Sequence, residues 1–450
     1  MQVSPIDYRY GRDEAKEIWS RNGRHSRLLE VERALVWAHC KMGKVSAEHY
    51  DKIADISDPG IVTAERVDEL EKETKHDIMA LTKAMAEVAG DAGWCIHLGA
   101  TSNDIVDSAV ALQIRDSIRL QRITMTELLR VLCDISERYR DTVMLGRTHG
   151  QAAVPITFGL KVAVWVDEFR RHLVRLDEME KRCITGKFLG AVGTGAALGP
   201  SALELQQLIM SELGLEIPVA TTQVVGRDRY IEWVGWMANV SSSIEKVLQE
   251  IRNLQRTEIG EVAEAFDVKK QVGSSTMAHK KNPITSENAC GLARIIRSMI
   301  MPSYENALLW HERDLANSSS ERFTLSHSMI LLDDIIVKCT SIMKNLVINR
   351  EQMKINLENQ RGLIMAEKVM LELVDRGVSR DIAHEILREA SMNTIENQSN
   401  LKSECKNNQI IKEKISEDEI DRMFNPLSHI GLSGEIVDNA IKLANNYISN

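Results

Sequence analysis

Two long stretches of the chain contain no proline, one between Pro59 and Pro155 and the other between Pro302 and Pro426. Because proline kinks or ends a helix, these stretches allow helices of unusual length. Apolar residues recur at spacings of three and four, the period of an amphipathic helix, and the alternation typical of strands is scarce. Only 4% of the 450 residues are aromatic. We therefore expect an all-α protein.

Two segments make the helical period visible. In the segment from Ile244 to Ile259, apolar positions share one face and charged residues occupy much of the other. In the segment from Leu160 to Met179, Val162 and Val166 widen the apolar stripe beyond what one neighbouring helix would cover. We expect both to pack in the core of a bundle. The main stripe of the second segment contains Val164, Trp165, Phe169, Leu173, Leu176 and Met179.

Breaks in the pattern predict three domains. Pro59 and Gly60 divide the first region into short helices, and a stretch rich in lysine and asparagine at 399–408 interrupts the last. We expect an N-terminal helical domain at 1–103, a central long-helix bundle at 104–350 and a C-terminal helical domain at 351–450.

Charge and cysteine usage exclude several classes of protein. The chain has 56 Lys and Arg against 65 Asp and Glu, a net charge of −9, which excludes a general binder of nucleic acid or anionic membranes. No run of 18 apolar residues and no secretion-signal pattern occurs. Seven scattered cysteines, never spaced as CxxC, favour neither a disulfide framework nor a zinc site. We expect a cytoplasmic protein without nucleic-acid or membrane partners.

Two familiar motifs can be set aside. GAVGTGAALG at 190–199 has glycines near dinucleotide-binding spacing, but no strand pattern precedes it, so we expect a loop between helices. His311 and Glu312 resemble the start of a zinc-protease motif, yet Leu315 stands where the second histidine is needed. We therefore expect no metal.

Four polar clusters interrupt the apolar pattern. The densest, at 271–287, reads QVGSSTMAHKKNPITSE. Taken alone, it fits a solvated basic loop as well as a mobile loop that brings a serine and cations to an anionic substrate. In the second, at 146–155, His149 lies between glycines, and histidine suits proton transfer near neutral pH. The other two clusters are 75–77 and His97 with 101–104.

These segments resemble the fumarase/aspartase superfamily. Residues 273–283, GSSTMAHKKNP, match its signature loop GSSxMPxKxNP except that Ala278 replaces a proline. Within the superfamily the chain resembles the adenylosuccinate lyases, in particular an archaeal-like branch. The shared segments are DYRYG at 7–11, KHDIMA at 75–80, HLGATSNDIVD at 97–107, GRTHGQ at 146–151, EIRNLQRTEI at 250–259 and LWHERDLANSSSER at 309–322.

The resemblance implies a C–N lyase of purine nucleotide synthesis that uses no cofactor or metal. It would release fumarate from adenylosuccinate to give AMP, and also from the succinyl-aminoimidazole carboxamide ribotide. Removing a carbon proton creates an aci-carboxylate, so the site needs a strong base and several donors. The resemblance implies that Ser274 is the base and that Lys280 supports its alkoxide. It further implies that His149 protonates the leaving nitrogen, oriented by Glu287, and that His76 is a second catalytic histidine.

The resemblance also implies the substrate contacts. Arg313, Ser318 and Arg322 resemble the element that grips the phosphate and the succinyl carboxylates, a task that suits the planar fork of arginine. Arg9 and Tyr10 resemble the pair that holds the phosphate and ribose. The other expected contacts are Lys75, Asp77, His97, Thr101, Ser102, Ser275 and Asn282.

Several positions depart from the family pattern and leave other functions open. Ala152 replaces a usual histidine, Gly226 replaces a glutamine that contacts substrate in relatives, and Lys75 stands where arginine or histidine is usual. The alternatives are another fumarate-releasing lyase, a carboxymuconate cycloisomerase-like member and a non-catalytic helical scaffold. The LWHERD segment argues against the cycloisomerase, and the retained catalytic residues argue against the scaffold.

The quaternary prediction follows from the spread of the site. Long helices would hold residues from Arg9 to Arg322 far apart in one subunit. The fold that the resemblance implies is a fumarase/aspartase-type three-domain fold with a central long-helix bundle. It forms a homotetramer around a shared helical core, with each nucleotide site shared between three subunits.

Overall fold

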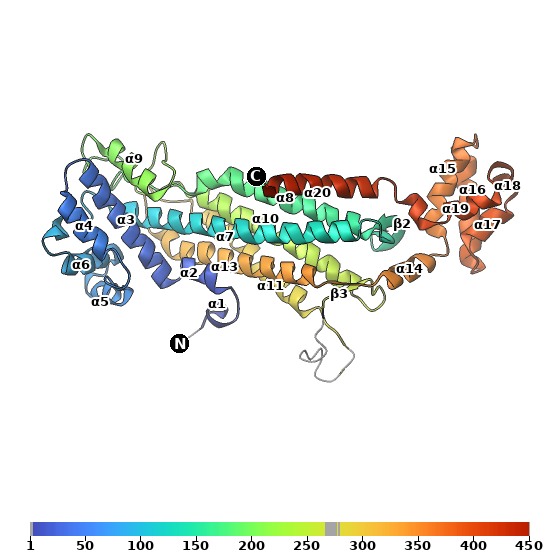
Figure 1. Ribbon diagram of the computed structural model, residues 1–450, viewed down its shortest axis with the longest axis horizontal. Coiled ribbons are helices and arrows are strands. Elements are labelled where there is room, and N and C mark those ends of the chain that lie inside the picture. Colours follow the sequence, from blue (N-terminus) through green and yellow to red (C-terminus); the bar gives the residue numbers. More distant parts are fainter. Residues whose placement is uncertain (1–2, 266–276, 278–279, 450) are drawn as a thin grey trace. The chain divides into compact units, whose positions relative to one another are not determined.

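The structure is a computed structural model that describes residues 3–265, 277 and 280–449. The predicted base Ser274 and the predicted contact Ser275 lie outside the described residues. Helices make up most of the described chain, and its strands are short (Figure 1). The expected all-α architecture is confirmed.

The chain divides into two compact units, each assembled from segments far apart in the sequence. The first unit contains residues 1–125, 172–244 and 291–337, and the second contains residues 126–171, 245–290 and 338–450. Several long helices have residues in both units. The three-domain division at 1–103, 104–350 and 351–450 stays a prediction.

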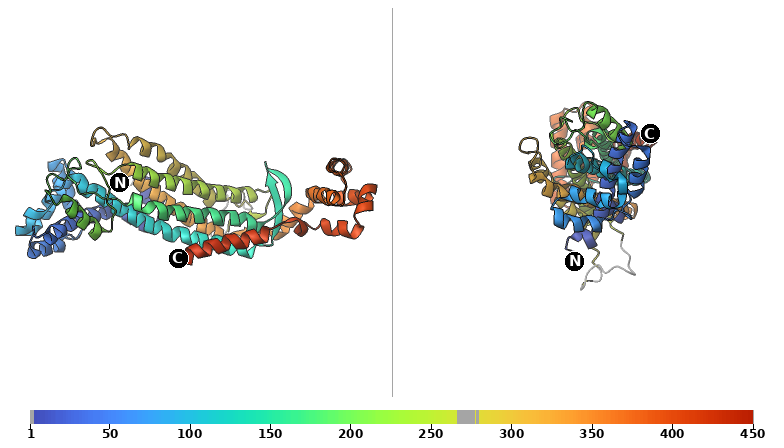
Figure 2. Two further views of the ribbon diagram at one scale, coloured as in Figure 1. Left: turned by 90° about the horizontal axis from the view of Figure 1, so that it is seen from above. Right: turned by 90° about the vertical axis from the view of Figure 1, so that its left-hand side faces the viewer.

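In the first unit, the helices α7, α10 and α13 run side by side (Figure 1; Figure 2). The partly buried Trp19 stacks on the fully buried Trp233, with ring centroids 6.0 Å apart. The elements that begin in this unit are α1 (Pro5–Tyr8), α2 (Asp13–Trp19), α3 (Arg21–Lys41), α4 (Ala47–Ile56), α5 (Ala64–Thr74), α6 (Asp77–Ala89), η1 (Gly90–Cys95), α7 (Ser102–Arg138), α9 (Ala202–Leu213), α10 (Asp228–Leu254), α12 (Ile300–Glu305) and α13 (Ala316–Lys344).

In the second unit, two antiparallel strand pairs accompany the helices: β1 pairs with β2, and β3 pairs with β4. The helices α15 to α19 gather into one compact group (Figure 1). The elements that begin in this unit are β1 (Val143–Thr148), β2 (Gln151–Thr157), α8 (Phe158–Cys183), β3 (Val262–Ala263), α11 (Ile284–Ser298), β4 (Val347–Ile348), α14 (Arg350–Glu358), η2 (Leu363–Met365), α15 (Ala366–Asp375), α16 (Arg380–Glu396), α17 (Leu401–Asn407), α18 (Gln409–Lys414), α19 (Glu417–Met423), η3 (Pro426–His429) and α20 (Ser433–Ser449).

Many helices begin at a side chain that satisfies a free backbone N–H of the first turn. Ser20 accepts a hydrogen bond from the amide of Gly23 at 2.9 Å at the start of α3. At the start of α19, Ser416 and Glu419 form a reciprocal capping box. Such caps stabilise a helix by about 1 kcal/mol each, and they explain why short helices form throughout the chain.

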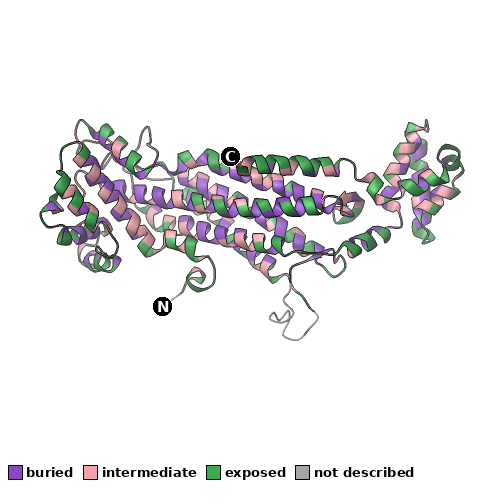
Figure 3. Ribbon diagram, in the orientation of Figure 1, coloured by how far each residue is buried: buried purple, intermediate pink, exposed green. Residues whose placement is uncertain are grey.

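The two predicted amphipathic helices exist, with differences in detail. In α10, Val247, Leu248 and Ile251 are fully buried, but the helix ends at Leu254, so its predicted extension to Ile259 is wrong. The chain turns there through Gly260, which has φ 62°. Most of the α8 stripe is buried as expected, whereas Val164 is 56% exposed. Figure 3 shows that the long helices carry both buried and exposed residues along their length.

A buried ion pair in the first unit fixes the start of α7. The carboxylate of Asp104 accepts a hydrogen bond from Lys187 Nζ at 2.5 Å, and both side chains are fully buried. Asp104 also accepts from the amides of Thr101 at 2.8 Å and Gly190 at 3.2 Å. One carboxylate therefore ties the loop that follows Lys187 to the first turn of α7. The predicted loop at 190–199 between helices is confirmed.

A second buried carboxylate holds the loop that precedes α7. Glu32 in α3 accepts hydrogen bonds from His97 Nδ1 at 2.7 Å and from the His97 amide at 3.1 Å. His39 contacts the carbonyl oxygen of Leu98 at 2.9 Å. Burial alone lowers the pKa of His97, but the hydrogen bond and the charge of Glu32 outweigh it and raise that pKa.

All seven cysteines are free thiols, and six of them are buried. None of the helices within the described ranges combines the length and the apolar character needed to cross a membrane.

We predict that Lys187→Met destabilises the protein by about 3 to 5 kcal/mol, because it leaves the Asp104 carboxylate buried without a cation. Urea unfolding measures this loss. The double variant Lys187→Met with Asp104→Asn should recover part of it, since the uncompensated charge is then gone. An unchanged free energy of unfolding in Lys187→Met would show that the ion pair does not stabilise the fold.

We also predict that the stabilisation by Glu32 depends on pH. A raised pKa of His97 means that the pair stabilises the fold fully below the unfolded histidine pKa of about 6.5 and loses this effect as the pH rises through the folded pKa. The difference in melting temperature between the parent protein and Glu32→Gln should therefore shrink as the pH rises. A difference that grows with pH would contradict the pairing, and adding His97→Gln to Glu32→Gln should abolish the trend.

Candidate active site

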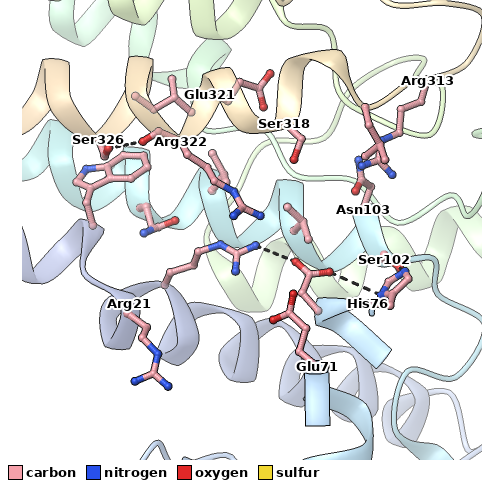
Figure 4. A pocket seen from close by; sticks show the side chains of 18 of the residues that line it. Arg21, Glu71, His76, Ser102, Asn103, Arg313, Ser318, Glu321, Arg322 and Ser326 are labelled. Atoms are coloured by element: carbon pink, nitrogen blue, oxygen red, sulfur yellow. Dashed lines mark hydrogen bonds and ion pairs between the residues drawn. The ribbon is translucent and has the colours of Figure 1, made fainter. Parts of the chain in front are cut away.

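A pocket of about 700 Å³ opens in the first unit (Figure 4). Its walls come from the start of α3, the junction of α5 and α6, the first turns of α7 and the start of α13. Seven residues predicted from the sequence line it. These are Lys75, His76, Asp77, Ser102, Arg313, Ser318 and Arg322.

The junction of α5 and α6 positions His76. Lys75 ends α5 in a left-handed conformation with φ 55°, and His76 is the residue that caps α6. Nδ1 of His76 accepts a hydrogen bond from the amide of Met79 at 3.3 Å, and Nε2 lies 3.4 Å from the hydroxyl of Ser102. The carboxylate of Asp77 pairs with Arg24 at 3.4 Å. The backbone therefore sets the ring of His76 at the pocket wall.

The other wall carries candidate anion ligands. Ser318 and Arg322 lie one turn apart on α13 and face the side of the pocket with His76 and Ser102 (Figure 4). Arg313 donates a hydrogen bond from Nη1 to Oε1 of Gln223 at 2.8 Å. The Nε of Arg313 is buried and has no partner among the described residues. Because Arg313 lines the pocket, its guanidinium is a candidate ligand for an anion.

A buried arginine aligns this wall with α7. Arg227, whose side chain is 4% exposed, donates to both oxygens of Asp107 at 2.9 and 3.0 Å and to Glu321 at 2.8 Å. Burial disfavours its charge, but Asp107 and Glu321 raise the pKa of Arg227 well above its ordinary value. Because Glu321 lies between Ser318 and Arg322 in sequence, the ion pairs fix the part of α13 that faces the pocket.

The pocket also contains residues that the sequence analysis missed. Gln223 lines the pocket, whereas Gly226, the position noted as a departure, does not. Arg21 points away from the other labelled side chains (Figure 4), and it forms ion pairs with Glu65 and Asp68. These residues are identified by their contacts in the structure, because no spacing in the sequence predicts that they line the pocket. The other unpredicted polar residues are Ser20, Arg24, Glu71, Asn103, Gln113, Asp314, Glu321 and Ser326.

In the second unit, His149 occupies the tip of a β-hairpin that the sequence analysis did not predict. Thr148 pairs with Gln151, so His149 and Gly150 form a two-residue turn with φ of 53° and 75°. His149 is exposed. Arg147 in β1 anchors the hairpin through ion-paired hydrogen bonds of 2.7 and 2.9 Å to the fully buried Glu261. A histidine and glycine between short apolar runs was the available signal for this turn.

A cavity of about 780 Å³ in the second unit brings together Lys280, Asn282 and Glu287. Glu287 lies in the first turn of α11, and Lys280 and Glu287 are both exposed. Arg252 in the last turn of α10 and Arg256, just after the helix, line the same cavity and make it cationic. Within the described ranges, no hydrogen bond or ion pair joins His149 to Glu287, so the predicted orientation stays a prediction.

Four predicted contacts lie outside these pockets. Arg9 is exposed at the end of α1, with its guanidinium 5.9 Å from the centre of the Tyr10 ring. Thr101 precedes α7, and His97 is bound to Glu32. Their contacts with substrate stay predictions. Among the residues that the structure describes, no group of three His, Cys, Asp or Glu side chains could hold a metal ion.

Comparison with known proteins identifies the family. A family described as lyase matches residues 7–297, and one described as adenylosuccinate lyase C-terminus matches residues 362–440. The chain is 44% identical to adenylosuccinate lyase from Archaeoglobus fulgidus, covering 99% of both chains. It is 43% identical to the enzyme of that name from Methanocaldococcus jannaschii, covering 99% of this chain and 97% of that protein.

Solved structures agree with the fold. The crystal structure of 3-carboxy-cis,cis-muconate lactonizing enzyme from Pseudomonas putida superimposes with a TM-score of 0.89 at 28% identity, over 98% of this chain and 99% of that chain. Fumarate lyase from Mesorhizobium sp. BNC1 gives a TM-score of 0.88 at 29% identity, with the same coverage. The expected fumarase/aspartase-type fold is confirmed. The chain shares more of its sequence with the two adenylosuccinate lyases, 44% and 43%, than with these two structures, and it belongs to the adenylosuccinate lyase family.

Proposed function

We propose that this lyase removes fumarate from adenylosuccinate to give AMP, and from the succinyl-aminoimidazole carboxamide ribotide, in purine nucleotide synthesis in the cytoplasm. The pocket of the first unit carries this proposal. It combines a histidine held at a helix start with two arginines and a serine whose donors suit the phosphate and carboxylates of such a substrate. No cofactor enters the proposed reaction.

The proposed elimination begins with a base. The alkoxide of Ser274 takes the proton from the succinyl carbon next to a carboxylate, and the electron pair that remains creates the aci-carboxylate. Lys280 and Asn282 then bind the carboxylate that gains charge, and Lys280 also stabilises the alkoxide. The cationic cavity around Lys280, with Arg252 and Arg256, supports this role because positive charge favours both anions.

The C–N bond then breaks, and its electron pair moves to nitrogen. His149 donates the proton that this nitrogen needs, and Glu287 stabilises the charged imidazole. His76 binds the purine side of the leaving group beside Ser102, since its ring stands at the wall of the pocket. The products are fumarate and AMP. Ser274 has then gained one proton and His149 has lost one.

The proposed substrate carries negative charge on its phosphate and on its succinyl carboxylates, and several residues bind these groups. Arg313, Ser318 and Arg322 hold the phosphate and the succinyl carboxylates, with Arg9 and Tyr10 at the phosphate and ribose. The smaller contacts come from Lys75, Asp77, His97, Thr101, Ser102 and Ser275.

We propose that the active enzyme is a homotetramer in which three subunits contribute to each site. The exposed position of His149 on its hairpin tip supports this idea, because an acid turned to solvent needs another surface to complete a water-excluding site.

We predict that the parent protein releases fumarate from adenylosuccinate, measured by the appearance of fumarate and AMP, and that Ser274→Ala and His149→Ala each abolish this activity. Both variants should keep the helical circular dichroism of the parent. Lactonisation of a carboxymuconate without fumarate release would favour the cycloisomerase alternative instead.

The same two variants test the shared site. Co-refolded in equal amounts into hybrid tetramers, they should regain activity at about one site in four, because Ser274 and His149 then come from different chains. Each variant refolded alone serves as the control. Complete inactivity after proven mixing of subunits would contradict the shared site.

We predict that Arg322→Met raises the KM for adenylosuccinate by about 10- to 100-fold, the effect of losing one charge-assisted contact with an anion. Arg119→Met, which removes an arginine from the exposed face of α7, is the matched control and should leave KM unchanged. The effect of Arg322→Met should be smaller on a substrate without the phosphate. Equal use of that substrate by the parent protein would argue against nucleotide recognition.

A further inference from the structure

The start of α11 is capped by a residue that lies far away in the sequence. A helix normally begins with a serine, threonine, asparagine or aspartate whose side chain accepts a first-turn N–H. Here Pro283 precedes the helix and has no such acceptor. Instead, Oε1 of Glu264 accepts from the amide of Ser286 at 2.7 Å, and Oε2 accepts from the amide of Thr285 at 3.3 Å.

Burial and charge make this cap strong. Glu264 is only 8% exposed, and Ser286 is fully buried, so water cannot replace these hydrogen bonds at low cost. A carboxylate is also the favoured charge at the positive end of a helix dipole. Glu264 therefore sets the position and direction of the first turn of α11, which carries Glu287.

Gln255 supplies a second link between the same two segments. It follows the last residue of α10, and its Oε1 accepts from the backbone amide of Glu264 at 2.9 Å. Its Nε2 donates to the carbonyl oxygen of Lys281 at 3.1 Å. One side-chain amide thus bridges residue 264 and residue 281, and both of its polar atoms are used.

Both links attach to the backbone directly beside residues that line the cationic cavity. Lys281 is the neighbour of Lys280 and Asn282, and Ser286 is the neighbour of Glu287. The contacts of Gln255 and Glu264 are with backbone atoms at these neighbours, and the side chains of Lys280, Asn282 and Glu287 line the cavity.

We infer that Gln255 and Glu264 are positioning residues of the elimination: together they form a clamp whose hydrogen bonds to the backbone fix the places of Lys280, Asn282 and Glu287. This inference rests on the proposed function. The arginines proposed to hold the phosphate do not line this cavity, so disrupting the clamp lowers kcat and leaves nucleotide binding in place.

The test uses the full-length enzyme with Gln255→Met, Glu264→Gln and the double variant. Each single variant is expected to lower kcat by about 10- to 100-fold, the scale of a misplaced catalytic group, with AMP binding unchanged. Because both links hold the same segments, the loss in the double variant should be smaller than the product of the two single losses. The matched controls are Gln409→Met and Glu413→Gln, an exposed pair on α18 joined at 3.1 Å, and both should behave as the parent.

Amide hydrogen exchange reports on the clamp without any substrate. Exchange should speed up at Thr285 and Ser286 in Glu264→Gln and at the Glu264 amide in Gln255→Met, with the rest of α11 unchanged. If the parent releases no fumarate, the proposed function fails and exchange alone decides whether the clamp exists. Unchanged exchange at these amides overturns the clamp. Unchanged kcat, or a loss of kcat accompanied by equal losses of AMP binding and melting temperature, overturns its positioning role.

Discussion

The pocket of the first unit depends on one buried guanidinium. Arg227 bonds to the carboxylates of Asp107 on α7 and Glu321 on α13, and both partners come from long helices that form pocket walls. A guanidinium can do this because its planar fork offers five N–H donors in fixed directions. A lysine ammonium at the same position lacks that fork, so the spacing of the two helices depends on arginine chemistry as well as on charge.

The sequence predicts the helical parts of this fold well, because an amphipathic period survives in any environment that buries one face. The buried Val247, Leu248 and Ile251 of α10 follow that period residue by residue. The end of the helix does not follow from the apolar period. The pattern continues to Ile259, but the helix stops at Leu254 and the chain turns before Gly260. Helix existence is a property of many residues, whereas a helix end depends on one or two.

Some polar residues of the pocket could be predicted from the sequence, and others could not. His76, Ser102 and Arg322 could be predicted as site residues because their segments resemble a known family, and the structure gathers them in one pocket. The roles of Arg227, Gln223 and Glu264 could not be predicted, because each arises from hydrogen bonds between segments distant in sequence. A single sequence records that a polar residue is present but not which backbone group it meets.

The cap on α6 decides the chemistry available to His76. A ring nitrogen that accepts a backbone N–H carries no proton itself, so the neutral imidazole has its proton on the other nitrogen. In His76 the acceptor is Nδ1, and the protonated atom is therefore Nε2, which faces Ser102. This tautomer makes His76 a donor toward the pocket in its neutral form. The cap on α6 therefore fixes the direction in which this ring can donate, toward the Ser102 side of the pocket.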